Sequence, residues 1–156
     1  MRQLYSAVLY LMQPFVLLRL LWRSRQEPGY RRRLGERFGR TTRPAPGGQV
    51  IWLHAVSVGE TQAAAPLVDA LLRAHPDYRV LLTTTTPSGS ERAQALFGDR
   101  VLHSYAPWDL PGSVKRFLRR AQPRLLVLME TELWPNTLHY CRQAGCPVVV
   151  AKILPR

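Results

Sequence analysis

Two glutamates each follow an apolar stretch of the kind that forms a buried strand. Glu60 closes LHAVSVGE (53–60), and Glu130 closes RLLVLME (124–130). In an open sheet with helices on both faces, ligands bind beyond the carboxyl ends of the strands, where the strand order reverses. With the order 3-2-1-4-5, the first and fourth strands are neighbours at that point, so the two carboxylates are expected to face one crevice. Paired carboxylates can divide general-base and positioning work between them.

The same residues also fit a purely structural role. Glu60 precedes a predicted helix, and the helix dipole favours an acidic side chain at a helix N-terminus. Glu130 and Glu132 can likewise cap the helix that follows them. Spacing alone favours neither interpretation.

A second stretch, TPSGSE (86–91), opens another predicted helix. Ser88 and Glu91 have the spacing of a capping box. The free N–H groups of that turn can instead take a phosphate. His54 and His103 lie in predicted strands, and we expect both to be core histidines. The two cysteines and four histidines show no metal-ligand spacing, and no GxGxxG follows the first strand, so we expect neither a metal nor a dinucleotide cofactor.

Strands and helices alternate along the second part of the chain, and this alternation predicts a parallel sheet covered by helices. The fold class expected is therefore α/β, a Rossmann-like doubly wound domain. Apolar runs predict strands, and helical spacing predicts the segments between them. The strands are expected at 50–56, 79–85, 100–106, 124–130 and 146–154, and the helices at 61–76, 87–98, 112–121 and 133–145.

The chain begins with an apolar segment, MRQLYSAVLYLMQPFVLLRLLW. The run from 4 to 18 is shorter than the roughly 20 residues that a spanning helix needs, and Pro14 is expected to kink or break it. No small-residue cleavage site follows, so a signal peptide is not expected. We therefore expect a membrane-associated helix, which either spans the bilayer or lies in its interface. The alternative is a helix that packs on the domain or on a partner protein.

The chain is strongly basic, with a formal net charge of +12. Residues 1–43 contain ten arginines and two glutamates, so most of the excess lies beside the apolar segment. An anionic partner is expected, and this position favours a membrane surface or phosphorylated ligand over nucleic acid, for which no reader motif appears. We divide the chain into a membrane-associated helix (1–25), a basic segment and linker (26–49) and the Rossmann-like domain (50–156). Residues 26–49 are either a solvated linker or a phosphate-binding surface.

Six motifs in order carry a resemblance that covers Met1 to about Ala151. They are YLMQPFVLLRL, YRRRLGERFG, LHAVSVGET, TTTTPSGSERAQ, PWDLPGSVKRFL and METELWPN. Together they resemble bacterial 3-deoxy-D-manno-octulosonic acid (Kdo) transferases. The resemblance implies the amino-terminal, acceptor-binding half of a two-domain GT-B glycosyltransferase.

The resemblance also implies a reaction and its residues. Such enzymes transfer Kdo from CMP-Kdo to lipid IVA, with inversion and without a metal, at the cytoplasmic face of the bacterial inner membrane. Glu60 matches the proposed general base and Glu130 a transition-state stabiliser. Residues expected to bind the acceptor or its phosphates are Ser57, Gly59, Ser88, Gly89, Ser90, Arg33 and Arg37.

The last residues, AKILPR, depart from the family pattern, which reads roughly NARLS there. The family's second domain, which binds the CMP-sugar, has no counterpart in this sequence. We therefore expect the isolated chain to be inactive. The alternative is a non-catalytic module that binds a lipid A precursor or an anionic membrane.

Overall fold

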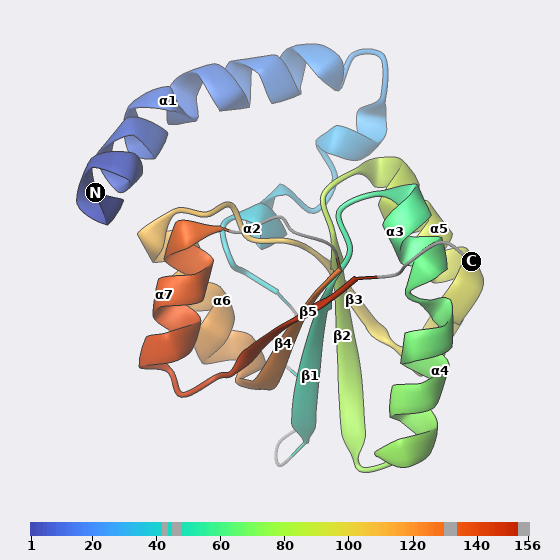
Figure 1. Ribbon diagram of the computed structural model, residues 1–156. Helices are drawn as coiled ribbons and strands as arrows, with labels where there is room; N and C mark the ends of the chain where they lie inside the picture. The colour runs from blue at the N-terminus through green and yellow to red at the C-terminus, as the bar shows by residue number, and fades with distance from the viewer. Residues whose placement is uncertain (42–43, 45–47, 130–133, 153–156) are drawn as a thin grey trace.

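Five parallel strands form one sheet in the computed structural model, which describes residues 1–41, 44, 48–129 and 134–152 (Figure 1). The order is β3-β2-β1-β4-β5, as the sequence predicted, so the Rossmann-like α/β fold is confirmed. In the centre, Leu53 of β1 pairs with Leu82 of β2 and with Val127 of β4. The strands are β1 (Gln49–His54), β2 (Tyr78–Thr84), β3 (Leu102–Tyr105), β4 (Pro123–Met129) and β5 (Val148–Ala151).

The central strands are apolar on both faces because each face is covered by helices. Successive side chains point to opposite faces, so each strand feeds two separate cores. One core holds Trp52, whose ring centroid lies 4.4 Å from that of Phe117. The other holds the neighbouring Leu53 together with Val68. Figure 1 shows α6 and α7 on one side of the sheet and α3, α4 and α5 on the other.

Proline and left-handed residues set several helix boundaries. Proline occupies the first turn of α4, α5, α6 and α7, where its missing N–H is not needed. Gly145, with φ of 68°, follows the end of α7 and lets the Cys146 N–H bond the Cys141 carbonyl at 2.9 Å. The helices are α1 (Arg2–Arg23), α2 (Leu34–Arg37), α3 (Val58–Ala63), α4 (Ala65–Ala74), α5 (Pro87–Phe97), α6 (Pro111–Ala121) and α7 (Pro135–Gln143), with 3-10 turns η1 (Pro28–Tyr30) and η2 (Gly98–Arg100).

The helix predicted at 61–76 was wrong in its boundaries. It is divided into α3, which starts earlier at Val58, and α4, and the two meet at Ala64. Pro66 explains the division, because it cannot donate the hydrogen bond that a continuous helix would need at that turn.

The basic segment before the sheet packs on the domain. The backbone N–H of Tyr105, at the end of β3, donates to the Glu36 carboxylate at 2.7 Å. Arg116 of α6 donates to the Phe38 carbonyl at 2.6 Å. Gly39 lies so close to α6 that a Cβ would sit 2.1 Å from the Ser113 carbonyl oxygen. This packing places the described residues 28–41 on the domain surface rather than in a solvated linker.

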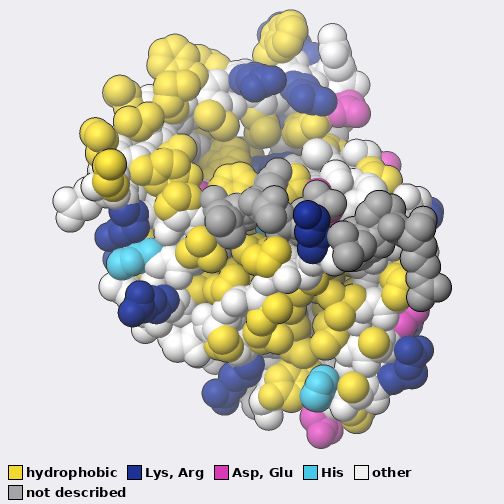
Figure 2. All heavy atoms as spheres, in the orientation of Figure 1, with side chains coloured by type: hydrophobic (Ala, Val, Ile, Leu, Met, Phe, Trp, Pro, Cys, Tyr) yellow, Lys and Arg dark blue, Asp and Glu magenta, His cyan; other side chains and the backbone are white. Residues whose placement is uncertain are grey.

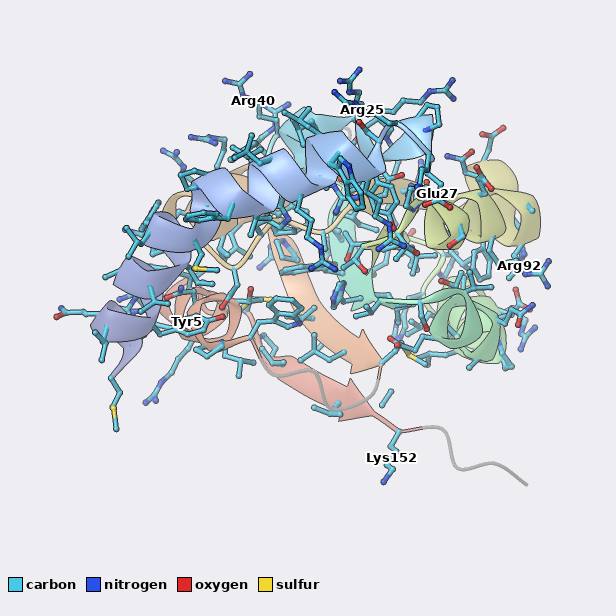
Figure 3. All side chains as sticks on the ribbon, turned by 90° about the horizontal axis from the view of Figure 1, so that it is seen from above. Tyr5, Arg25, Glu27, Arg40, Arg92 and Lys152 are labelled. Carbon is cyan, nitrogen blue, oxygen red and sulfur yellow. The ribbon has the colours of Figure 1, made fainter. Side chains whose placement is uncertain are left out.

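Helix α1 crosses above the carboxyl edge of the sheet (Figures 1 and 3). It runs for 22 residues without a break at Pro14. Within the described part of the chain, it is the one helix long and apolar enough to cross a membrane by length and composition, with a mean hydropathy of 1.6. Its outward face carries exposed apolar side chains, namely Leu4, Val8, Leu11, Met12, Phe15, Val16, Leu18, Leu21 and Trp22.

The inward face of α1 is polar and is hydrogen-bonded to the domain. Ser6 is buried and donates to the Asn136 side-chain oxygen at 3.1 Å, and Arg2 donates to the same oxygen at 3.2 Å. Tyr5 donates to Asp109 at 3.0 Å. These contacts fix the first turns of α1 against the start of α7.

Candidate active site

A cavity of about 350 Å³ opens where β1, β2 and β4 end. It lies at the edge of the sheet where the order reverses, between β1 and β4, which is where an open α/β sheet binds its ligand. Its lining is mostly apolar with a few polar groups, as ligand sites usually are. The lining residues are Arg37, Trp52, His54, Val56, Thr85, Ala106, Pro107, Trp108, Leu128, Trp134 and Thr137.

A larger groove of about 670 Å³ lies at the other edge of the sheet. Its lining includes Gln49 and Pro123, which begin β1 and β4. It is therefore separated from Glu60 and from the cavity by the length of the strands, and it does not enter the candidate site.

Glu60 is held at the carboxyl end of β1 by a set of capping contacts. Ser57 is the N-cap of α3, and its hydroxyl oxygen accepts from the Glu60 N–H at 3.3 Å. The Glu60 carboxylate accepts from the Val56 N–H at 2.8 Å and from the Ser57 hydroxyl at 3.2 Å. The structural role considered for Glu60 is therefore real. Each carboxylate oxygen still has a free lone pair, so the same group can accept a proton from a ligand.

The loops after β1 and β2 are joined beside this carboxylate. The Thr85 hydroxyl donates to the Val56 carbonyl at 2.9 Å. The Thr85 carbonyl in turn accepts from Arg37 Nη2 at 2.9 Å. These bonds bring Arg37 of α2 to the same edge as Glu60.

Arg37 is buried, with 4% of its surface exposed. Its guanidinium carbon lies 4.3 Å from the Tyr105 ring centroid. Among the described residues it has no carboxylate within ion-pair distance, and its Nε has no hydrogen-bond partner. Burial lowers the pKa of Arg37 below its usual range. A buried cation is costly unless polar contacts compensate it, and among the described residues the Thr85 carbonyl and the Tyr105 ring supply such contacts.

Arg33 makes different hydrogen bonds and ion pairs from Arg37. Its Nε pairs with the Glu36 carboxylate at 2.8 Å, and its Nη2 donates to the His103 carbonyl at 2.9 Å. It also donates to the Ser90 hydroxyl at 3.3 Å, so these two expected binding residues do meet. Most of the hydrogen-bonding capacity of Arg33 is used to join α2, β3 and α5.

The capping box expected at Ser88 was wrong. Thr86 is the N-cap of α5, and its hydroxyl accepts from the Gly89 N–H at 3.1 Å. Pro87 explains the difference, because the residue before a proline is forced into an extended conformation and proline itself favours the first helical position. Ser88 is exposed, whereas Gly89 and Ser90 are buried. At α3, Gly59 is exposed in the first turn.

Glu130 lies outside the described residues, and its place opposite Glu60 stays a prediction. The strands that lead to the two glutamates do pair, with His54 beside Leu128. The described residues contain no group of three His, Cys, Asp or Glu side chains placed to hold a metal, and the expected lack of a metal likewise stays a prediction.

The two strand histidines differ in their burial. His54 is buried, as expected, and its Nδ1 lies 2.9 Å from the Thr83 hydroxyl. His103 is half-buried and lies within 3.1 Å of Arg33. Burial lowers the pKa of each to about 4, and the Arg33 charge adds to the effect on His103. Both are neutral at pH 7, so His54 contributes no charge to the cavity.

Sequence reasoning missed three residues that build the site. Trp108 and Trp134 form cavity walls. Asp109 accepts from the backbone N–H groups of Asn136 and Thr137 at 3.0 and 2.7 Å, and so caps α7 from a distant loop. Their only sequence signal was membership of the PWDLPG and LWPN motifs, because a tertiary cap has no local spacing.

Comparison with known proteins gives one consistent result. The family model described as 3-Deoxy-D-manno-octulosonic-acid transferase (kdotransferase) matches residues 32–152. The chain is 45% identical to the 3-deoxy-D-manno-octulosonic acid transferase of Haemophilus influenzae, covering 96% of this chain and 35% of that protein. It is 41% identical to the Bordetella pertussis protein of the same name, covering 96% and 36%. A probable mitochondrial counterpart in Arabidopsis thaliana is 38% identical, covering 87% and 30%.

Proposed function

The chain belongs to the Kdo transferase family, and from this premise we propose that it supplies the acceptor-binding half of a transferase that moves Kdo from CMP-Kdo to lipid IVA. The observation that carries the proposal is the Glu60 carboxylate, held by Val56 and Ser57 at the strand edge beside the cavity. That edge is where an acceptor hydroxyl must meet a base.

The proposed step is an inverting displacement. A sugar hydroxyl is a poor nucleophile, and a carboxylate within hydrogen-bond reach removes its proton as the new bond forms. Glu60 takes that proton, the acceptor oxygen bonds to the anomeric carbon of Kdo, and the bond from that carbon to CMP breaks. CMP leaves with the electron pair of that bond. Glu130 is proposed to stabilise the developing charge.

The donor is proposed to be bound by other polypeptide. The chain spans about a third of the length of the Haemophilus influenzae and Bordetella pertussis relatives. At the edge strand β5, Val149 and Val150 are 49% and 43% exposed although they point to opposite faces. Figure 2 shows apolar side chains in this region of the surface. Such an edge is suited to packing against further protein, and we expect no turnover by the chain alone.

A transfer assay tests the proposal. The purified chain is mixed with CMP-Kdo and lipid IVA, alone and with the carboxyl-terminal part of the Haemophilus influenzae relative. We expect product only in the mixture and its loss with Glu60→Gln. The matched control, Glu91→Gln, changes an exposed glutamate in α5 and should leave the product unchanged. Turnover by the chain alone, or full activity with Glu60→Gln, would contradict the proposal.

We also propose that α1 lies in the membrane interface rather than crossing the bilayer. Its polar face is engaged by Asp109 and Asn136, while its apolar side chains point outward. Figure 2 shows these apolar atoms gathered over α1, with basic side chains at its carboxyl end. Insertion across a bilayer would require the inward hydrogen bonds to be broken. With α1 in the interface, the basic residues at its carboxyl end would face anionic headgroups on the cytoplasmic side.

The outward face of α1 also favours a second candidate function, a non-catalytic module that binds a lipid A precursor or an anionic membrane. The transfer assay with the added carboxyl-terminal part distinguishes the two candidate functions. Lipid IVA binding by a folded chain, with no product in any mixture, would support the module.

A further inference from the structure

The two cysteines of the chain meet at the carboxyl end of α7, and the proposed transfer uses neither of them. Cys141 lies in the last turn of the helix, and Cys146 follows Gly145, which has a φ of 68°. The Cys146 N–H donates to the Cys141 carbonyl at 2.9 Å. Inside this bond, the Gly145 N–H donates to the Arg142 carbonyl at 3.2 Å. The two bonds form a Schellman motif, in which the side chains of the residues joined by the outer bond commonly pack together, so the two thiols are neighbours.

Both thiols are buried in the same core and interact with each other. Cys141 is 0% exposed and Cys146 is 3% exposed, in the cluster that also contains Trp52 and Phe117. Hydrogen bonding with Cys146, together with burial, raises the pKa of Cys141. Hydrogen bonding with Cys141 lowers the pKa of Cys146. Two cysteines with adjoining backbones and facing side chains meet the conditions for a disulfide.

One of the two thiols can be reached from the surface. Cys146 lines an open hollow of about 480 Å³ between the end of α7 and the start of β5, whereas Cys141 does not line it. Arg142 lines the same hollow, and a nearby arginine favours the reactive thiolate form of a cysteine. Cys146 is therefore the thiol that a small reagent can reach and that ionises more readily. Cys141 is placed to react with Cys146 rather than with the reagent.

We propose that Cys141 and Cys146 form a reversible disulfide by exchange with a small disulfide such as oxidised glutathione, with Cys146 as the attacking thiol and Cys141 as the resolving thiol. Cys146 loses its proton and attacks one sulfur of the small disulfide, whose S–S bond breaks and whose other half leaves as a thiol with that proton. Cys141 then loses its proton and attacks the Cys146 sulfur, and the second half leaves as a thiol with that proton. Two hydrogens and two electrons thus pass from the protein to the small disulfide. The inference goes beyond the proposed function and does not depend on it.

The disulfide would fasten the end of α7 to the segment that enters the sheet. Pro147 follows Cys146, and its carbonyl accepts from the Leu126 N–H of β4 at 2.9 Å. Strand β5 begins at the next residue, and Figure 1 shows the short connection between α7 and β5. Disulfides of proteins in reducing compartments are usually transient and redox-sensing. The bond would therefore make the rigidity of this junction depend on the thiol–disulfide balance around the protein.

Mass spectrometry of the folded chain tests the proposal. The reduced chain is incubated with oxidised glutathione, its remaining thiols are alkylated, and its mass is measured. We expect a product that is lighter than the reduced chain by two hydrogens, takes up no alkylating reagent and reverts with dithiothreitol. Its melting temperature should be higher by about 3 °C or more. Two unreacted thiols, an accumulation of glutathione adducts alone, or a lower melting temperature after oxidation would overturn the proposal.

Serine variants test the order of attack. Cys141→Ser leaves Cys146 without a resolving partner, so its glutathione adduct should accumulate. Cys146→Ser leaves the fully buried Cys141, which should react about tenfold or more slowly. In urea the two variants should react at equal rates, because the difference arises from the fold. Equal rates in the folded variants would refute the assigned roles. Circular dichroism identifies a variant that does not fold, and the wild-type experiment then decides alone.

A charge variant tests the contribution of the hollow. Arg142→Gln should slow the reaction of Cys146 a few-fold, because it removes the cation that favours the thiolate. Arg73→Gln changes an exposed arginine of α4, on the other side of the sheet, and is the matched control that should react at the wild-type rate. Equal slowing by the two variants would show that the effect is one of net charge and would contradict a local role of Arg142.

Discussion

Tyr5 and Asp109 are joined by a 3.0 Å hydrogen bond between the phenol hydroxyl and Oδ2, although 104 residues separate them in the chain. The same carboxylate accepts from the backbone N–H groups of Asn136 and Thr137, which open α7. One buried side chain therefore holds α1 and the start of α7 together. Figure 3 shows Tyr5 between the first turns of α1 and α7.

Replacing Asp109 by asparagine should destabilise the domain. Both carboxylate oxygens are surrounded by N–H and O–H donors, so an amide would place its own N–H group against a donor. We expect a loss of about 2–3 kcal/mol in the free energy of unfolding, the range for a buried bond to a charged group. Urea denaturation measures it. Asp99→Asn, at an exposed aspartate, is the control, and equal stability of the two variants would refute the role of Asp109.

Substitutions of Glu60 and Ser57 should differ in their effects on transfer activity and on stability. The reason is that proton removal and helix capping are separate functions of the same turn. Glu60→Gln keeps an oxygen that can accept from Val56, so it should change stability by under about 1 kcal/mol while abolishing transfer. Ser57→Ala removes the N-cap and should cost about 1 kcal/mol while keeping the base. Activity in the mixed assay and urea unfolding are measured on both. A Glu60→Gln protein that is unfolded, rather than inactive and folded, would favour the structural role alone.

Stability should fall below neutral pH because His54 and His103 are held neutral. Their pKa values are lowered to about 4, so between pH 6.5 and pH 4 the unfolded chain binds protons that the folded chain does not. Folding stability is therefore full above pH 6.5 and decreases as the pH falls through this window. For the fully buried His54 the loss is on the order of 3 kcal/mol. Urea unfolding at pH 7 and 4.5 measures it, and His103→Gln should reduce the difference; an unchanged difference would contradict this account.

Gly39 and Gly98 offer a matched pair with positive φ. Both have left-handed φ angles, 83° and 51°, but a Cβ at Gly39 meets the Ser113 carbonyl oxygen at 2.1 Å, whereas at Gly98 nothing lies within 4 Å. Gly98→Ala should cost about 1–3 kcal/mol from backbone strain alone, because φ 51° with ψ −132° is a conformation that L side chains rarely adopt. Gly39→Ala should cost clearly more, because α2 must move away from α6. Thermal unfolding of both variants measures the difference. Equal melting temperatures would mean that the segment 28–41 does not pack against α6 at Gly39.

The outward face of α1 should control membrane binding. Phe15 is 65% exposed there, and burying a side chain of its size in an apolar phase contributes about 1.5–3 kcal/mol. Phe15→Ser should therefore weaken binding to phosphatidylglycerol vesicles about tenfold or more in a co-sedimentation assay. Val149→Ser, at an exposed valine of β5, is the control and should bind normally. Unchanged binding of Phe15→Ser would place the membrane contact elsewhere.

The sequence alone determined the order of strands and helices, the parallel sheet and the edge at which Glu60 lies. These follow from local apolar runs, helix periodicity and the topology rule for wound sheets, all of which can be read from neighbouring residues. Local chemistry also misled, since Ser88 had the spacing of a cap but Pro87 forced the cap onto Thr86.

Only the tertiary structure decided which face of α1 meets the domain and that Arg37 is buried beside three tryptophans. It also showed that Asp109 caps a helix 26 residues further along the chain, at Pro135. These features depend on contacts between segments far apart in sequence, and a hydrogen bond or a buried charge across such a distance has no periodicity. For that reason the amino-acid pattern indicated a basic segment, whereas the folded chain placed one of its arginines in the cavity next to the proposed base.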